Sequence, residues 1–196
     1  MQEKVKCFYH GTGDYLDLAL TNMLSIIETG FIKSKNKQNE LKTSFAERGL
    51  YNGVDYISLC AWDESVDHRI ESFDSAFNGW IYGCPFFILS NDINAVHCKK
   101  IKLGTTYDPT IERVSQFSDE WHVKDVIPIT KVLGIALPLD VINADLEKGL
   151  IEPETFEKVK KIIKLAEKNG WFILERCDEL AVESIENYIS SIAKKR

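Results

Sequence analysis

The sequence predicts an α+β protein of 196 residues, and three observations support this fold class. Short aromatic and β-branched segments separated by turn signals fill the first part of the chain, which is typical of strands. After Leu137-Pro138 the pattern changes to helical spacing. A hydrophobic content of 44% is enough to bury a core. We therefore expect a core over 1–137 and a helical C-terminal extension over 138–196, packed on the core as one unit.

Five or six strands are expected before Pro138. The candidate segments are KVKCFYH (4–10), YISLC (56–60), GWIYGCPFFIL (79–89), AVHCKKIKL (95–103), WHVKDVI (121–127) and KVLGIAL (131–137). Turn signals such as TG, NG and YDPT lie between them. Trp62, Trp80 and Trp121 are expected to be core anchors, because large aromatic side chains in strands usually serve packing.

Helices are expected in both parts of the chain. In the first part, apolar residues at helical spacing predict a helix from Asp14 to Thr29, with Gly30 as its C-cap. In the extension, Pro153 suits a first helical turn and Gly170 is placed to stop the helix that follows. A last helix is predicted over 178–193.

Composition narrows the functional classes. The net charge of −6 argues against a protein whose affinity comes from covering phosphate backbones, although a local basic groove stays open. The cysteines are odd in number and form no CxxC pair, so neither a disulfide framework nor a zinc site is expected. No stretch approaches the roughly 20 apolar residues of a membrane helix, and MQEKVKCFYH lacks the apolar core of a signal peptide. We expect a cytoplasmic protein where it is made, with no membrane partner.

The segment FYHGTG (8–13) places His10 between aromatic residues and a flexible turn. Taken alone, a histidine at a strand end is more often a structural residue than a ligand contact. Two further segments bear on the question. GVDYISLC (53–60) opens a predicted strand with Tyr56, and SDEWHVKDVIPITKVLGIAL (118–137) opens another with Glu120.

These segments, in this order and spacing, resemble the ADP-ribosyltransferase superfamily, in its His-Tyr-Glu branch of poly(ADP-ribose) polymerases and diphtheria-toxin-like enzymes. There the first strand ends in His-Gly-Thr or His-Gly-Ser, and the following helix ends in a stretch like Ile26–Phe31. A tyrosine begins a second strand, and a catalytic glutamate begins a late one. The resemblance covers about residues 5–137 and implies a split β-sheet core with flanking helices.

The resemblance also implies roles for individual residues. His10 would bind a hydroxyl of the adenosine ribose of NAD+, and the backbone of Gly11 would hold the nicotinamide carboxamide. Tyr56 would stack on nicotinamide, and Glu120 would grip the ribose and stabilise the oxocarbenium-like state of glycosidic cleavage. The other candidate NAD-binding residues are Thr12, Ser58, Ser65 and His68. Neither a metal nor a covalent nucleophile is required.

The implied activity is mono-ADP-ribosylation with release of nicotinamide. The expected acceptor is a protein, with a nucleic acid or a small molecule left open. Relatives that modify arginine or asparagine carry Glu or Gln two residues before the catalytic glutamate, but Ser118 stands there, so the acceptor residue is not assigned. No acceptor-helix platform for polymer formation is recognisable. A small stand-alone domain of this kind is typical of bacterial or phage effectors and toxins, which are delivered to another cell.

Other interpretations stay open at the level of sequence. The chain could be a catalytically silent module that binds NAD or ADP-ribose, an NAD glycohydrolase without acceptor, or a cysteine hydrolase using Cys7, Cys60 or Cys84. Tyr56 could be a core residue with a tethered hydroxyl, and Glu120 an exposed acid at a strand end. The segment 62–72 also reads as an ordinary solvated helix.

Overall fold

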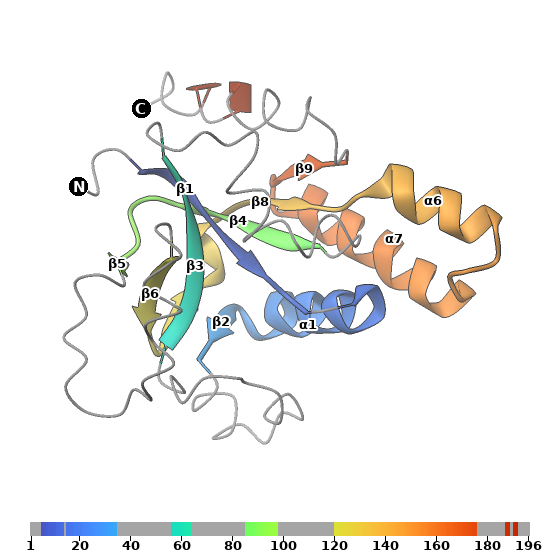
Figure 1. Ribbon diagram of the computed structural model, residues 1–196, viewed down its shortest axis with the longest axis horizontal. Coiled ribbons are helices and arrows are strands. Elements are labelled where there is room, and N and C mark those ends of the chain that lie inside the picture. The colour runs from blue at the N-terminus through green and yellow to red at the C-terminus, as the bar shows by residue number, and fades with distance from the viewer. Residues whose placement is uncertain are drawn as a thin grey trace.

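In the computed structural model, the residues described are 5–13, 15–34, 56–63, 85–97, 120–175, 187–188 and 190–191. They form the expected α+β fold, with a large and mostly antiparallel sheet flanked by helices (Figure 1). The helices are α1 (Leu16–Thr29), α6 (Leu139–Glu147) and α7 (Pro153–Lys168). The strands are β1 (Val5–Gly11), β2 (Phe31–Lys33), β3 (Tyr56–Asp63), β4 (Phe86–Ser90), β5 (Val96–His97), β6 (Glu120–Lys124), β7 (Val126–Pro128), β8 (Val132–Ala136) and β9 (Phe172–Leu174).

The strands form two sheets. The main sheet has the order β5-β6-β3-β1-β4-β8-β9, and β2 pairs with β7 in a separate two-stranded sheet. All pairs are antiparallel except β8 with β9. The sheets separate at Asp125, between β6 and β7, whose φ of 65° lies in the left-handed region and turns the chain sharply. The strands β6, β3 and β1, which carry the candidate motifs, are neighbours in the main sheet.

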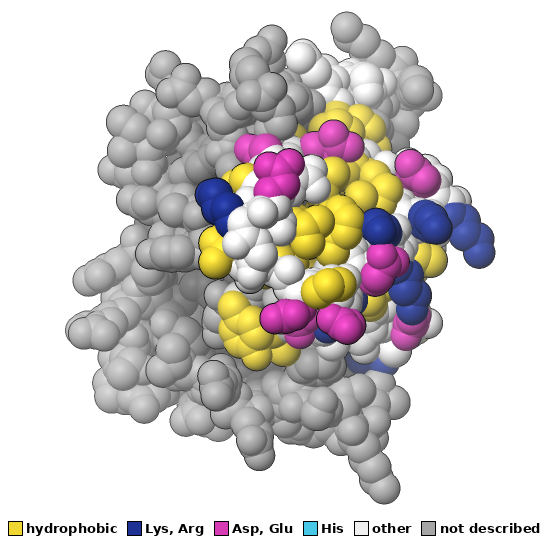
Figure 2. Space-filling model, turned by 90° about the vertical axis from the view of Figure 1, so that its right-hand side faces the viewer, with side chains coloured by type: hydrophobic (Ala, Val, Ile, Leu, Met, Phe, Trp, Pro, Cys, Tyr) yellow, Lys and Arg dark blue, Asp and Glu magenta, His cyan; other side chains and the backbone are white. Residues whose placement is uncertain are grey.

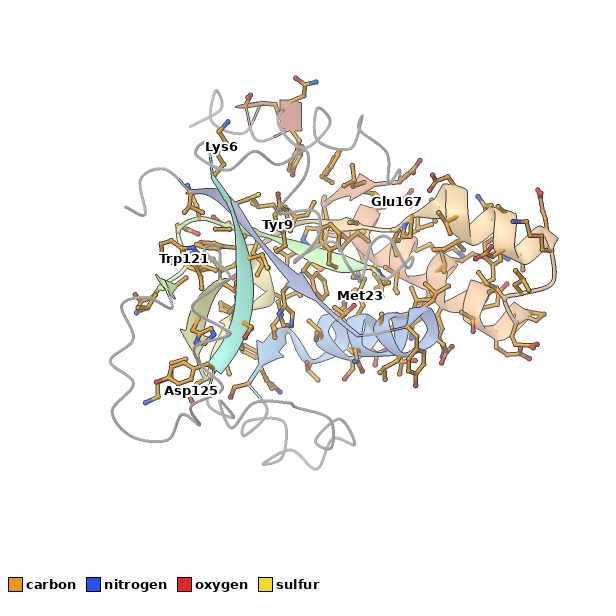
Figure 3. All side chains as sticks on the ribbon, in the orientation of Figure 1. Lys6, Tyr9, Met23, Trp121, Asp125 and Glu167 are labelled. Carbon is orange, nitrogen blue, oxygen red and sulfur yellow. The ribbon has the colours of Figure 1, made fainter. Side chains whose placement is uncertain are left out.

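Helix α1 forms as predicted, although it begins at Leu16 rather than Asp14. Its end is fixed by Gly30, which has a φ of 78° and donates its N–H to the Ile26 carbonyl at 2.9 Å. This left-handed cap is the reason a glycine stands there. Leu20 and Met23 are fully buried, and Figure 3 places Met23 between the helix and the strands.

The core lies against one face of the main sheet. Phe8 and Trp121 contact edge to face at 5.5 Å, and Phe87 meets Trp171 in the same manner at 6.2 Å. Trp121 is 7% exposed and belongs to this core, which confirms that it is a core anchor. Of the other tryptophans in question, Trp80 and the side chain of Trp62 lie outside the described part of the chain.

The predicted strands differ from the observed ones at several places. The segment 121–127 is two strands in different sheets rather than one, because of the turn at Asp125. The strands β2 and β9 are not predicted, because three residues are too few to show a period. Residues 79–84 and 98–103 lie outside the described part, and of the helix predicted over 178–193 only 187–188 and 190–191 are described, all helical.

The C-terminal residues join the core through a strand and a helix. Strand β9 extends the main sheet by pairing in parallel with β8. Helix α7 lies against α1, where Lys158 pairs with Asp17 at 2.7 Å and Lys161 with Glu28 at 2.7 Å. Figure 2 shows this end of the molecule, with lysine and acidic side chains interspersed around apolar ones.

The hydrogen bonds that Lys158 and Thr155 donate to Asp17 hold the pKa of its carboxyl below the ordinary value. Among the described residues, no helix has the length and apolar character needed to cross a membrane.

Candidate functional site

His10 lies near the end of β1, and its ring contacts the neighbouring strand β3. Its Nδ1 is 3.0 Å from the carbonyl oxygen of Ser58. Because a carbonyl oxygen only accepts, Nδ1 carries the hydrogen, and in the neutral ring Nε2 is then an acceptor. Burial lowers the pKa of His10 from its ordinary 6.5, partly offset by this hydrogen bond. His10 is therefore a neutral ring at pH 7 that offers one acceptor nitrogen.

Tyr56 and His122 form a stacked aromatic pair on β3 and β6. Their ring centroids are 5.6 Å apart, with 26° between the ring planes. His122 is buried, at 5% exposed, whereas Tyr56 is only half-buried. In the described part of the chain the Tyr56 hydroxyl has no hydrogen-bond partner, so the alternative of a core tyrosine with a tethered hydroxyl finds no support there. The ring keeps surface on which a flat ligand could stack.

Ser58 connects the two histidines. It lies opposite His122 in the β3–β6 register, and its Oγ is 3.5 Å from His122 Nε2, which is long for a hydrogen bond. Its carbonyl oxygen accepts from His10. His10 shares the core face of the sheet with Phe87, whereas the side chains of Ser58 and Tyr56 lie on the other face, so the structure links His10 to Ser58 only through the Ser58 backbone.

Gly11 and Thr12 follow His10 but differ in character. Gly11 is exposed, its φ is not positive, and a Cβ built there meets nothing within 4 Å. No described atom therefore requires a glycine at this place. Thr12 is buried, and its hydroxyl donates to the Pro85 carbonyl at 2.8 Å, while Asn22 donates to the Thr12 carbonyl at 2.6 Å. Thr12 fastens the turn after β1, so its hydroxyl proton is not free for a ligand.

Glu120 is the first residue of β6, as the sequence predicts for a strand-opening glutamate. It lies opposite Cys60, two register positions from the Ser58–His122 pair and four from the Tyr56–Lys124 pair. A strand rises about 3.3 Å per residue, so the Cα atoms of Glu120 and Tyr56 are separated by about 13 Å along the sheet. The side chain of Glu120 lies outside the described part, as do Ser65, His68 and Ser118.

His122 is not among the residues that the sequence predicts for the site. The alternation of a strand does contain a signal, because residues at i and i+2 share a face and His122 is two residues after Glu120. The same alternation places Trp121 in the core, as observed. In EWHVK, His122 is therefore the uncharged polar residue that shares a face with Glu120.

The described residues also bear on two other kinds of site, a cysteine nucleophile and a metal centre. Burial raises the pKa of the Cys7 thiol to about 12, which keeps it protonated and unreactive at neutral pH. Cys60 is a partly buried thiol, and Cys84 lies outside the described part. Within the described ranges, no three His, Cys, Asp or Glu side chains gather in a way that could hold a metal ion.

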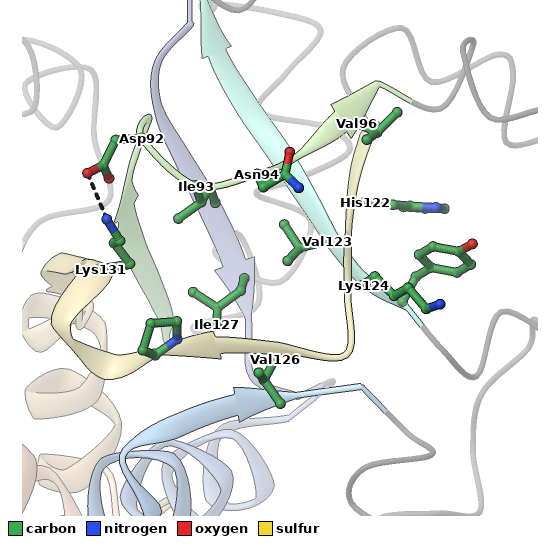
Figure 4. A pocket seen from close by; sticks show the side chains of 12 residues that line it. Asp92, Ile93, Asn94, Val96, His122, Val123, Lys124, Val126, Ile127 and Lys131 are labelled. Carbon is green, nitrogen blue, oxygen red and sulfur yellow. Dashed lines mark hydrogen bonds and ion pairs between the residues drawn. The ribbon is translucent and has the colours of Figure 1, made fainter.

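A cleft of about 370 Å³ opens beside the Tyr56–His122 pair (Figure 4). Its walls come from the segment before β5, from β6 and from β7, and Lys131 and Asp92 close one side with an ion pair of 2.7 Å. Its volume lies within the usual range of small-ligand pockets. The residues lining the cleft do not include His10, Gly11 or Ser58.

Comparisons with protein-family models, with curated proteins and with solved structures return no significant match for this chain.

Proposed function

We propose that this protein is an NAD-dependent mono-ADP-ribosyltransferase. The observation that supports it best is the hydrogen bond from His10 Nδ1 to Ser58, because it joins two of the sequence motifs and fixes the tautomer of the ring. The acceptor nitrogen that remains, Nε2, matches a donor such as a ribose hydroxyl. Half-buried Tyr56 and open Gly11 supply the other features expected for binding nicotinamide.

The fold supports the same assignment. An ADP-ribosyltransferase-like core is expected to have a split sheet with flanking helices, and the division into a main sheet and the β2–β7 pair agrees with this expectation. The three motif residues lie on adjacent strands: His10 near the end of β1 and Tyr56 at the start of β3 share one end of the sheet, whereas Glu120 at the start of β6 lies toward the other end.

In the proposed mechanism, Tyr56 stacks on the nicotinamide ring and Gly11 holds its carboxamide through the backbone. Glu120 binds the nicotinamide ribose and stabilises the positive charge that develops as the glycosidic bond breaks. Because about 13 Å separates the Cα atoms of Tyr56 and Glu120 along the sheet, the nicotinamide and its ribose would lie between them, along β3. Nicotinamide leaves with the bonding electron pair, and the acceptor nucleophile adds to the ribose carbon and loses its proton.

The acceptor is proposed to be a protein, and the setting that of an effector or toxin which is cytoplasmic where it is made. These parts of the proposal rest on the resemblance alone. The principal alternative is a catalytically silent module that binds NAD or ADP-ribose. The Glu120 carboxylate distinguishes the two, since binding alone does not need a charge that stabilises the transition state.

The test is to incubate the purified protein with NAD labelled in its adenosine half, with and without a cell lysate. We expect release of free nicotinamide and transfer of label to macromolecules. Nicotinamide release without transfer in any lysate would indicate a glycohydrolase. If NAD raises the melting temperature of the protein but is never cleaved, the chain is a binding module and the proposed activity is wrong.

A further inference from the structure

The cleft beside Tyr56 lies where β6 continues past the end of its pairing with β5. Where the structure describes it, strand β5 pairs with Trp121 and His122, through His97 and Val96. Before β5 the chain turns away, with the Ala95 N–H donating to the Ile93 carbonyl at 2.8 Å. Within the described residues, no strand therefore covers the outer edge of β6 at Val123 and Lys124. Such an edge presents unpaired backbone groups to an incoming strand.

Apolar side chains line and flank this edge. Ile93, Val123 and Ile127 form a buried floor, and Val96 and Val126 stand on opposite sides of it in Figure 4. Val96 is 42% exposed and Val126 39%. Such apolar exposure around a concave site is typical of a surface that binds a partner.

The charges around the cleft are not balanced. Asp92 and Lys131 neutralise each other in their ion pair. Lys124 is exposed, and its ammonium group has neither a hydrogen bond nor a salt bridge with a described residue. Of the charges that the described residues place around the cleft, Lys124 is the one outside this ion pair, and it is positive.

We propose that this cleft is the docking site for an extended peptide segment of the acceptor protein. An apolar side chain of the peptide inserts between Val96 and Val126, its backbone pairs with the outer edge of β6, and an acidic residue beside the apolar one meets Lys124. The edge that no described strand covers favours a peptide over a small molecule, because the backbone at Val123 and Lys124 can pair with an extended chain. The term acceptor rests on the function proposed above, whereas the peptide binding itself does not.

The binding test uses two pools of short fluorescent peptides. Each pool carries a mixture of Leu, Ile, Val and Phe at a central position, flanked by Glu in one pool and by Lys in the other. Fluorescence anisotropy should show that the wild-type protein binds the Glu pool at least about five-fold more tightly. Lys124→Glu should reverse this preference, and Val96→Asp should weaken the binding of both pools.

The matched controls lie at the other end of the molecule, between α6 and α7. Leu150 is 71% exposed and Lys148 is a surface lysine, so Leu150→Asp and Lys148→Glu repeat the same chemical changes away from the cleft. Both should bind the pools as the wild type does. Lys124 is exposed, so Lys124→Glu should also melt as the wild type does.

Equal or absent binding of the two pools by the wild type, or an unchanged preference in Lys124→Glu, would overturn the docking proposal. Its failure is distinguishable from that of the proposed function. Peptide binding without cleavage of NAD would leave the docking site in place and remove the enzyme assignment. Cleavage of NAD without the charge preference would keep the enzyme assignment and remove the docking site.

Discussion

His10 is the residue whose chemistry the structure defines most closely. Its Nδ1–H is committed to the Ser58 carbonyl, and burial disfavours its protonated form. A charged ring would also place a donor on Nε2, where the neutral ring has an acceptor. The protonation of His10 thus affects both the stability of the protein and the hydrogen-bonding role of Nε2 in the candidate site.

The first prediction concerns this linkage. Because the folded-state pKa of His10 is depressed, the unfolded chain binds the proton more readily once the pH falls through the unfolded value near 6.5. His10 therefore costs no stability well above that pH and lowers stability progressively below it. His10→Asn removes this contribution. Urea denaturation at pH 7.5 and 5.5 should show a smaller loss of stability on acidification in the variant than in the wild type, and an equal loss would contradict the assigned shift.

A substitution at Gly11 can test NAD binding with little effect on the stability of the fold. A Cβ at this position meets nothing within 4 Å and the backbone φ is not positive, so Gly11→Ala should change the free energy of unfolding by less than about 0.5 kcal/mol. If the Gly11 backbone holds nicotinamide, the added methyl group obstructs that approach and should weaken NAD binding by about ten-fold, or 1.4 kcal/mol. Calorimetric titration with NAD measures this. Wild-type affinity in the Ala variant would remove Gly11 from the site.

Tyr56 tests the stacking surface. Tyr56→Phe keeps the ring that meets His122 and loses a hydroxyl with no partner in the described residues, so NAD should still raise the melting temperature. Tyr56→Ala removes the ring, and the rise caused by NAD should vanish although the protein remains folded. The same ligand-induced rise in all three proteins would place Tyr56 outside the pocket.

At the scale of elements, several strands are set by contacts between distant segments, which the local sequence pattern does not show. The sequence predicts α1, α7 and the strands β1, β3 and β4, because each has a clear period or a clear stop signal. It does not predict the break at Asp125 or the pairing of β2 with β7. A non-glycine residue with positive φ is uncommon, and the segment 121–127 continues to read as one strand through it.

Gly134 is where such a contact is tightest. A Cβ there would lie 2.6 Å from the Phe172 carbonyl oxygen on β9, and that contact is to backbone, which cannot easily move. Gly134→Ala should therefore displace β9 from β8 and lower the free energy of unfolding by about 1–3 kcal/mol. Chemical denaturation measures the loss, with Gly11→Ala as the control for a glycine in open space. A variant as stable as the wild type would contradict the tight packing of β9 against Gly134.

At the scale of the whole molecule, the C-terminal residues are part of the body that carries the site. Strand β9 completes the main sheet, and α7 is tied to α1 by the Lys158–Asp17 and Lys161–Glu28 ion pairs. Helix α1 in turn holds the turn after β1, through the hydrogen bond from Asn22 to Thr12. The extension therefore contacts the helix that fastens the His10 turn.

The candidate site could be predicted in part. The motifs name His10, Ser58 and Tyr56, which lie on the paired strands β1 and β3, with His10 on the core face and the side chains of Ser58 and Tyr56 on the other face. They do not show that the Thr12 hydroxyl donates a hydrogen bond to the Pro85 carbonyl, nor that His122 stacks on Tyr56. Both facts depend on contacts between strands far apart in the sequence, which no local pattern records.

The central claim is that Glu120 makes this chain an enzyme, and the direct measurement is the rate of nicotinamide release from NAD by the wild type and by Glu120→Gln. Losing a contact realised mainly in the transition state should slow release by about 10²–10³-fold, or 2.7–4 kcal/mol, while the melting temperature and the affinity for NAD stay close to wild type. A Gln variant that releases nicotinamide as fast as the wild type would contradict the account.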